Sequence, residues 1–259
     1  MDLGIAGRKA IICASSRGLG RGCAEALAEA GCDLVINGRD VHVLEATAAD
    51  LARRFGVTVT PVVADVSTPE GQATLLAACP DPDILVNNNG GPPRKDYDQL
   101  DRAAMIAGVV GNMITPIELI QKVIGPMSER GFGRIVNITS SSVKAPISGL
   151  DLSSGARAGL TAFLGGVARD VAQKGVTINH LLPGKFDTDR LVGGFARAAK
   201  EAGVSVEEAK RREIAAIPAG RLGTPEEFGK VCAFLCSVHA AYITGQSFLL
   251  DGGLIRTNF

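Results

Sequence analysis

The stretch KAIICASSRGLGRGCAEALAEAG, residues 9–31, decides the fold of this chain. It opens with a short apolar run, which is typical of a strand buried on both faces. It closes with alanine and leucine at helical spacing. Gly18 and Gly20 lie where the strand would turn into the helix, so backbone N–H groups there can approach a phosphate at the helix N-terminus. The stretch therefore predicts a strand, a helix and, between them, a phosphate-binding turn that comprises Ser15, Ser16, Arg17, Gly18, Leu19 and Gly20.

Similar apolar runs recur along the chain and alternate with helical patterns. Besides residues 9–14, we expect strands at residues 33–37, 58–63, 83–87, 134–139, 177–182 and 247–250. We expect helices at residues 19–30, 41–55, 69–78, 116–130, 153–173 and 225–237. This βαβ alternation predicts an α/β fold with a Rossmann-type, doubly wound parallel sheet of about seven strands. No linker or repeat interrupts it, so we expect residues 1–259 to form a single domain.

One insertion breaks the alternation between the sixth and seventh expected strands. Residues 187–218 contain two helical patterns, LVGGFARAAKEAG and SVEEAKRREIAA. Open α/β sheets bind ligands beyond the carboxyl ends of their strands, so we interpret this insertion as a small helical lid over a substrate. Its basic side chains either attract an anionic substrate or form a solvated face that nearby glutamates balance. The basic residues are Arg197, Lys200, Lys210, Arg211 and Arg212.

Composition excludes several classes of protein. The formal net charge is zero, whereas a nucleic-acid-binding protein would usually carry a basic excess. Six cysteines include no C-x-x-C pair, so we expect reduced thiols and no metal site. We see no secretory signal and no apolar stretch that approaches the length of a membrane span. These features predict a cytoplasmic protein without a nucleic-acid or membrane partner.

The end of the second expected strand indicates which nucleotide the turn would hold. A carboxylate there would bind the adenosine ribose of NAD, but VINGRD at residues 35–40 offers Asn37 and then Arg39. Arg17 in the turn adds a second guanidinium, and guanidinium groups match phosphate geometry. The sequence therefore favours NADP(H) over NAD(H), unless both arginines are simply solvated.

Further motifs make the chain similar to one known family. They are ADV at residues 64–66, ILVNNNGG at 84–91, GRIVNITSSS at 133–142, LPGKFDT at 182–188 and YITGQSFLLDGG at 242–253. With the glycine turn, they resemble the short-chain dehydrogenase/reductase family, especially its 3-oxoacyl-acyl-carrier-protein reductase-like members. The resemblance covers essentially the whole chain and implies an active-site Asn112 and a catalytic Ser140. Besides the turn residues, it implies cofactor contacts at Asp65, Val66, Asn88, Gly90, Arg157, Pro183, Gly184 and Thr188.

The chain departs from the family at the reaction centre. The family carries a Tyr-x-x-x-Lys pair, with the tyrosine thirteen residues after the catalytic serine. Counting from Ser140 places Ser153 at the tyrosine position and Arg157 at the lysine position. Ala14 also replaces the first glycine of the turn, and Asn89 replaces the alanine of N-N-A-G. An alkyl alcohol and a guanidinium are both poor proton donors at pH 7, so the usual acid is missing.

Three functions stay open at this point. The first is NADPH-dependent reduction of a carbonyl, a 3-oxoacyl group or another ketone, to an alcohol. In it, Ser140 and Ser153 would bind the developing alkoxide, Arg157 would add positive charge, and a water near Asn112 would carry the proton. The second is reduction of an imine, whose iminium form needs no acid. The third is a catalytically impaired nucleotide-binding sensor or non-catalytic subunit. By resemblance, we also expect a homotetramer (or a homodimer) built from the helices at 116–130 and 153–173.

Overall fold

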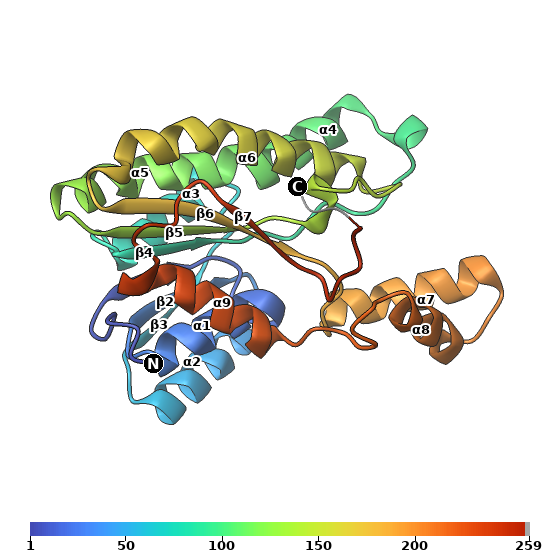
Figure 1. Ribbon diagram of the computed structural model, residues 1–259, viewed down its shortest axis with the longest axis horizontal. Helices are drawn as coiled ribbons and strands as arrows, with labels where there is room; N and C mark the ends of the chain where they lie inside the picture. The colour runs from blue at the N-terminus through green and yellow to red at the C-terminus, as the bar shows by residue number, and fades with distance from the viewer. Residues whose placement is uncertain (257–259) are drawn as a thin grey trace.

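The computed structural model describes residues 1–256 and contains one seven-stranded sheet (Figure 1). Every pair of neighbouring strands is parallel, in the order β3-β2-β1-β4-β5-β6-β7. The doubly wound parallel sheet expected from the sequence is therefore confirmed. The strands are β1 (Lys9–Ile12), β2 (Asp33–Gly38), β3 (Val59–Val63), β4 (Ile84–Asn87), β5 (Gly133–Ile138), β6 (Val176–Pro183) and β7 (Ser247–Leu250).

Helices cover both faces of the sheet. One face packs against α1 (Gly18–Glu29), α2 (Val41–Phe55) and α9 (Pro225–Cys236), and the other against α3 (Pro69–Ala78), α5 (Thr115–Glu129) and α6 (Asp151–Ala172). Successive strand side chains point to opposite faces. In β1, Ile12 accordingly joins the core under α1 and α9, while Ile11 joins the core under α5 and α6.

A close crossing of α1 and α9 fixes the helix that follows β1. A Cβ at Gly22 would lie 2.2 Å from the carbonyl oxygen of Pro225, and a Cβ at Gly229 would lie 2.0 Å from that of Gly22. Only glycine permits this approach of the two backbones. α9 itself begins with a reciprocal cap, in which Thr224 accepts from the N–H of Glu227 and Glu227 accepts from the N–H of Thr224. The crossing holds the N-terminus of α1 at the carboxyl edge of the sheet.

The sequence did not predict the helical turns before α5. α4 (Arg102–Val109) continues through a wide π turn, Val110–Ile114, directly into α5. The resulting segment Arg102–Glu129 has 28 residues and contains an 18-residue stretch with a mean hydropathy of 1.6, so by length and composition it could cross a membrane. The expectation that no apolar stretch approaches a membrane span is therefore wrong. The inner face of α5 is nevertheless core, and a core helix passes the same test.

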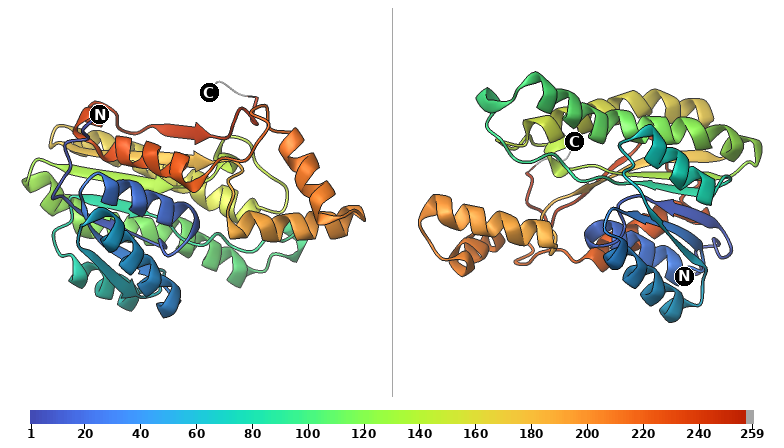
Figure 2. Two further views of the ribbon diagram at one scale, coloured as in Figure 1. Left: turned by 90° about the horizontal axis from the view of Figure 1, so that it is seen from below. Right: turned by 180° about the vertical axis from the view of Figure 1, so that it is seen from behind.

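The insertion after β6 forms two helices that stand apart from the sheet (Figures 1 and 2). They are α7 (Asp189–Ala202) and α8 (Val206–Ala215). A small apolar cluster of Phe195, Ile217 and Leu222 holds them to the following loop. Both helical patterns that the sequence indicated between residues 187 and 218 are thus present, beside the carboxyl ends of the strands.

Candidate active site

The turn after β1 is held by its own hydrogen bonds. Ser15 is buried, and its hydroxyl donates to the carbonyl of Ile12 at 2.7 Å and accepts from the N–H of Asn37 at 3.1 Å. Ala14 adopts a φ of 45°, the left-handed conformation that its glycine counterpart in the family would adopt without strain. A Cβ at Gly20 would lie 2.3 Å from the carbonyl oxygen of Ala14, so glycine is required there. The turn therefore exposes the unpaired N–H groups of the α1 N-terminus, an anion-binding geometry.

Two arginines lie at this end of the sheet: Arg17 is part of the turn, and Arg39 directly follows β2. The side chains of Arg17 and Arg39 are 57% and 79% exposed, and each lies 3.8 Å from one carboxylate, Asp40 and Asp65 respectively. Such loose, exposed pairs contribute little energy and leave both guanidiniums free to turn to a phosphate. Asn37 is not available to a ribose, because its buried amide donates to the carbonyls of the β3 strand and the loop after it, at 3.0 Å each. The adenine end of the cleft therefore presents arginine and no free amide.

Asp65 has a second anchor beside Arg39. Its carboxylate accepts from the N–H of Ser67 at 2.9 Å and from the hydroxyl of Ser67 at 2.6 Å. These hydrogen bonds, with a smaller contribution from Arg39, lower the pKa of Asp65. Val66 is buried, whereas Asp65 is partly exposed.

Asparagines of the loop after β4 connect the turn to the reaction centre. Asn88 donates to the carbonyl of Ala14 at 3.0 Å, which ties the loop to the phosphate-binding turn. Asn89 donates to the carbonyl of Gly111 at 3.1 Å, and its amide oxygen accepts from the N–H of Gly90 at 2.8 Å. Gly111 lies in the π turn, so Asn89 clamps the segment that carries the next active-site candidate.

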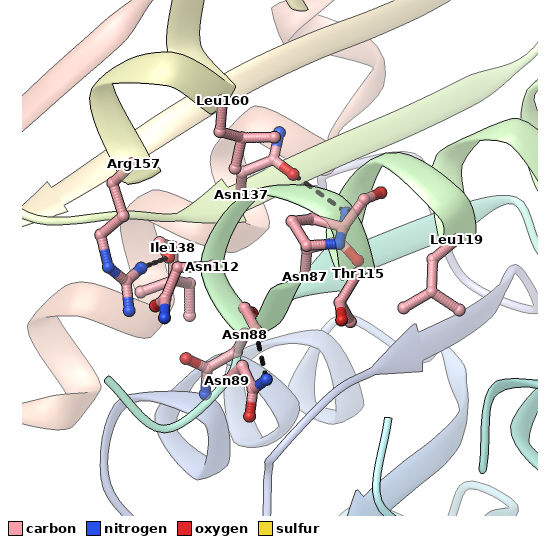
Figure 3. Close-up of a pocket in the computed structure, with 12 residues that line it drawn as sticks. Asn87, Asn88, Asn89, Asn112, Thr115, Leu119, Asn137, Ile138, Arg157 and Leu160 are labelled. Atoms are coloured by element: carbon pink, nitrogen blue, oxygen red, sulfur yellow. Dashed lines mark hydrogen bonds between the residues drawn. The ribbon is translucent and has the colours of Figure 1, made fainter. Parts of the chain in front are cut away.

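Four candidate catalytic residues come together from three elements. Asn112 lies in the π turn, Ser140 follows β5, and Ser153 and Arg157 lie on α6. Arg157 donates from Nη1 to the carbonyl of Ile138 at 2.6 Å and from Nε to the hydroxyl of Ser153 at 3.1 Å. Figure 3 shows its guanidinium beside Asn112. Arg157 thus connects the end of β5, which leads to Ser140, with Ser153.

Both serine hydroxyls remain free to donate. The oxygen of Ser140 accepts from the N–H of Ser142 at 3.1 Å and from the hydroxyl of Ser142 at 2.9 Å. The oxygen of Ser153 accepts from Arg157. Each of these bonds uses the oxygen as an acceptor and leaves its own proton available. Both hydroxyl protons therefore remain available for a further hydrogen bond.

The electrostatics of the centre are dominated by Arg157. Its side chain is buried, and no carboxylate lies within ion-pair distance in the described residues. Burial, and to a smaller extent the positive charge of Arg190, lower the pKa of Arg157 to about 10. Arg157 therefore stays charged at pH 7 and creates a positive potential that an anionic group would relieve.

A small polar cavity lies behind Asn112 (Figure 3). Its volume is about 20 Å³, and asparagine and threonine side chains line much of it. The amide oxygens of Asn87 and Asn112 and the hydroxyl of Thr115 are buried without a hydrogen-bond partner in the described residues. Asn87 also donates to Asn137 at 2.9 Å across β4 and β5. The cavity has the room and the polar neighbours that one water molecule needs.

Comparison with known proteins identifies the family. The family described as Enoyl-(Acyl carrier protein) reductase matches residues 13–255. The chain belongs to the short-chain dehydrogenase/reductase family. The 3-oxoacyl-[acyl-carrier-protein] reductase FabG of Aquifex aeolicus is 30% identical over 98% of this chain and 100% of that protein. The NADPH-dependent reductase BacG of Bacillus subtilis is 29% identical over 96% of this chain and 98% of that protein.

Solved structures of the family superimpose closely. The structure of YwfH, an NADPH-dependent reductase involved in bacilysin biosynthesis, has a TM-score of 0.91 and 28% identity, and covers 97% of this chain and 100% of that one. An L-sorbose reductase from Gluconobacter frateurii, complexed with NADPH and L-sorbose, has a TM-score of 0.93 and 28% identity, and covers 99% and 100%. The family's fold is therefore present over the whole described chain.

The segment after β6 joins the lid to the family's cofactor cleft. Gly184 donates its N–H to the carbonyl of Leu250 at 2.8 Å, and a Cβ there would lie 2.6 Å from the Cβ of Asp251. Pro183 ends β6 directly before it. Thr188, the N-cap of α7, faces Gly18, since a Cβ on Gly18 would lie 3.7 Å from the Thr188 methyl. The start of the lid therefore closes one side of the phosphate-binding turn.

The sequence missed two groups of residues around the site. Asn87, Thr115 and Asn137 line the cavity, and the only signal for Asn87 and Asn137 was an amide inside otherwise apolar strands. Arg190 contacts the loop after β4 from the first turn of α7. No motif marks Arg190, because its position depends on where the lid meets the sheet.

Proposed function

We propose that this chain is an NADPH-dependent reductase that converts a carbonyl, a 3-oxoacyl group or another ketone, to an alcohol. The observation that carries the proposal is Arg157, a buried guanidinium that has no carboxylate partner in the described residues and that donates to the Ser153 hydroxyl and to the carbonyl of Ile138, two residues before Ser140. Such a site favours a substrate oxygen on which negative charge develops. The catalytic residues proposed are Asn112, Ser140, Ser153 and Arg157.

The phosphate-binding turn fits NADPH. The close approach at Gly20, the free N-terminus of α1 and the exposed Arg17 and Arg39 suit a pyrophosphate and a 2′-phosphate. The names of BacG, YwfH and the sorbose reductase structure all specify NADPH. Bound there, NADPH would supply the hydride. The proposed contacts are the turn residues 15–20, Arg39, Asp65, Val66, Asn88, Gly90, Arg157, Pro183, Gly184 and Thr188.

Each catalytic side chain has a separate task. Ser140 and Ser153 donate hydrogen bonds to the substrate oxygen, and Arg157 stabilises the negative charge that grows there. Asn112 donates to the carbonyl of Gly108 at 3.2 Å, which holds the π turn, and its free amide oxygen binds water. A water molecule near Asn112 relays a proton from bulk solvent to the alkoxide, because a serine hydroxyl is too weak an acid to give up its own proton and Arg157 keeps its charge at pH 7.

The same charge weighs against the imine alternative. An iminium substrate is a cation, and Arg157 would repel it in a buried site where screening is weak. A sensor without turnover would not need hydroxyl donors at the reaction centre. We therefore place carbonyl reduction first.

The remaining parts of the proposal concern the lid, the assembly and the compartment. Residues 187–218 act as a substrate lid beside the cleft, and the chain forms a homotetramer, or a homodimer, in the cytoplasm. Exposed apolar side chains on α4, the π turn and α6 support the assembly, since clusters of such side chains mark interaction sites. They include Met105, Ile106, Val109, Ile114 and Phe163. The six buried free thiols agree with a reducing compartment.

A cofactor-oxidation screen tests the function. Purified protein is titrated with NADPH and NADH by calorimetry, and NADPH oxidation is then followed with ketones and 3-oxoacyl thioesters. We expect tighter binding of NADPH and turnover of at least one carbonyl. Tight NADPH binding without turnover of any carbonyl or cyclic imine would replace this proposal with the sensor. Absence of binding to either nucleotide would overturn it altogether.

A further inference from the structure

Arg190 is exposed to solvent and lies against the loop after β4. It is the second residue of α7 and reaches across to the loop after β4. A Cβ added at Gly91 would lie 2.5 Å from Nη2 of Arg190 and 2.7 Å from Nη1. The guanidinium therefore rests on the backbone of Gly91, at a place where a side chain would displace it.

Arg190 differs from the other arginines of the lid. Arg197 lies 3.5 Å from Glu201, Arg212 lies 2.7 Å from Glu208, and Arg211 also pairs with Glu208. These pairs support the interpretation of the outer lid as a solvated, balanced face. Within residues 1–256, no carboxylate lies within 4.0 Å of Arg190 or of Arg157.

The two unpaired guanidiniums act on one another. The charge of Arg190 adds to burial in lowering the pKa of Arg157, which means that the two cations are close enough to repel. Two like charges that face one cleft without a counter-ion raise the energy of the folded protein. An anionic group bound between them would reverse the sign of this interaction.

The position of Arg190 indicates whether it would contact the substrate or the cofactor. Thr188 faces Gly18 and hence the phosphate-binding turn, whereas Arg190, two residues later, lies against Gly91. Gly91 follows two residues after Asn89, which lines the same cavity as Arg157. The far end of the cleft already has its own guanidiniums, Arg17 and Arg39, and the turn has the α1 N-terminus. Arg190 therefore lies on the side where the substrate meets the reaction centre.

We propose that Arg190 binds an acidic group of the substrate, so that the enzyme reduces oxo acids in preference to neutral ketones. A guanidinium accepts a carboxylate in a bidentate fork, and the glycine at position 91 leaves room for its planar end. The inference rests on the proposed function, since it names the substrate class of the same site. The anion could come from the substrate or from the pyrophosphate of the cofactor, and the experiment separates the two.

The test measures binding and turnover separately. Benzoate and malonate, with benzamide and malonamide as neutral partners, are titrated into the free protein and into its NADP⁺ complex. A 3-oxo acid and its methyl ester are compared as substrates in the NADPH oxidation assay. The variants are Arg190→Gln, Gly91→Ala and the matched control Arg53→Gln, an exposed arginine on α2 that removes the same charge far from the cleft.

We expect the native protein to prefer each carboxylate to its amide and the oxo acid to its ester. Arg190→Gln should weaken carboxylate binding about 10- to 100-fold, the range for a lost hydrogen bond between charged groups, and should leave amide binding and NADPH affinity unchanged. Gly91→Ala should reduce the same preference by a smaller factor, and Arg53→Gln should preserve it.

Two results would overturn the inference. One is equal binding of carboxylates and amides by the native protein. The other is an Arg190→Gln variant that loses NADPH affinity while its preference for carboxylates is retained, which would assign Arg190 to the pyrophosphate. A native protein that binds no nucleotide would instead refute the proposed function, and the carboxylate titration of the free protein would still decide the role of Arg190.

Discussion

At the scale of single residues, Ser153 is the departure from the family with the largest expected chemical consequence. It replaces the family's phenol with an alcohol on the first turn of α6, where Arg157 donates to its oxygen. A hydroxyl that accepts from a cation becomes a better donor, because the bond polarises its O–H. In the proposed mechanism Ser153 would therefore help to stabilise the developing alkoxide, although it supplies no proton.

We expect Ser153→Ala to lower kcat about 100-fold, the usual effect of removing one donor from an oxyanion site. The neighbouring Ser154 provides the control, because its buried hydroxyl donates to the carbonyl of Leu150 at 2.9 Å within the helix. Ser154→Ala should keep kcat. Steady-state assays of both variants measure the difference, and equal activity of Ser153→Ala and the native enzyme would remove Ser153 from the mechanism.

His180 predicts how stability depends on pH. It is buried in β6 with Nδ1 unpaired, and desolvation lowers its pKa from 6.5 to about 4. The unfolded chain therefore binds a proton between pH 6.5 and 4 that the folded chain refuses, so stability is lost as pH falls through this window. We expect His180 to contribute at most about 3 kcal/mol of this loss.

Urea unfolding of the native protein, His180→Leu and His42→Leu between pH 7 and pH 4 measures this contribution. His42 is exposed on α2, so its variant should follow the native curve. His180→Leu should flatten the curve relative to both. If the free energy of unfolding falls with pH to the same extent in all three proteins, another group causes the loss of stability at low pH.

At the scale of elements, the π turn between α4 and α5 is held by a hydrogen bond from the loop after β4. Asn89 donates to Gly111 in that turn, and this contact accounts for an amide where the family has alanine. Asn89 touches no catalytic side chain directly in these contacts, so it is a positioning residue for Asn112. A small displacement of a catalytic group can cost as much as 100-fold in rate.

We expect both Asn89→Ala and Asn89→Asp to lower kcat about 10-fold with KM unchanged, because each loses the donor to Gly111. The aspartate variant keeps the acceptor for the N–H of Gly90. If Asn89 acted only by stabilising its own loop, Asn89→Asp would preserve that role and its kcat would match the native value. That outcome would exclude the clamp.

The crossing of α1 and α9 is the second element-scale constraint. Gly229→Ala places a methyl 2.0 Å from the carbonyl oxygen of Gly22, so the two helices must separate. We expect a loss of about 2–3 kcal/mol in the free energy of unfolding, as for overpacked cores, and weaker NADPH binding because the α1 N-terminus moves.

Gly193→Ala on α7 is the opposite case, since a Cβ there meets nothing within 4 Å. We expect it to gain up to about 1 kcal/mol, the helix preference of alanine over glycine. Denaturant titration of both variants gives the comparison. A Gly229→Ala variant as stable as the native protein would mean that the crossing tolerates a wider separation.

At the scale of the whole molecule, the exposed apolar side chains on α4, the π turn and α6 indicate an interaction surface. Its presence also explains why Arg102–Glu129 passes a length-and-hydropathy test for membrane spans, since apolar residues line both sides of that segment. We expect Phe163→Glu, whose native side chain is 50% exposed, to reduce the oligomer to a smaller species in sedimentation velocity. A native protein that sediments as a monomer would contradict the proposed assembly.

Three features could be predicted from the sequence alone: the seven strands, the glycine turn, and the positions of Ser140, Ser153 and Arg157. The strands follow from runs of apolar residues, the turn from its glycines, and the residue positions from motif spacing, and all of these are local properties of the sequence. Strand ends shifted by only one or two residues, as at β1, where the turn begins after Ile12. The tertiary structure decided the cavity at Asn112, the hydrogen bond from Asn89 to Gly111 and the contact of Arg190 with Gly91. Those contacts join residues far apart in the chain, and a single sequence carries no local pattern for the distance between two side chains that only the folded sheet brings together.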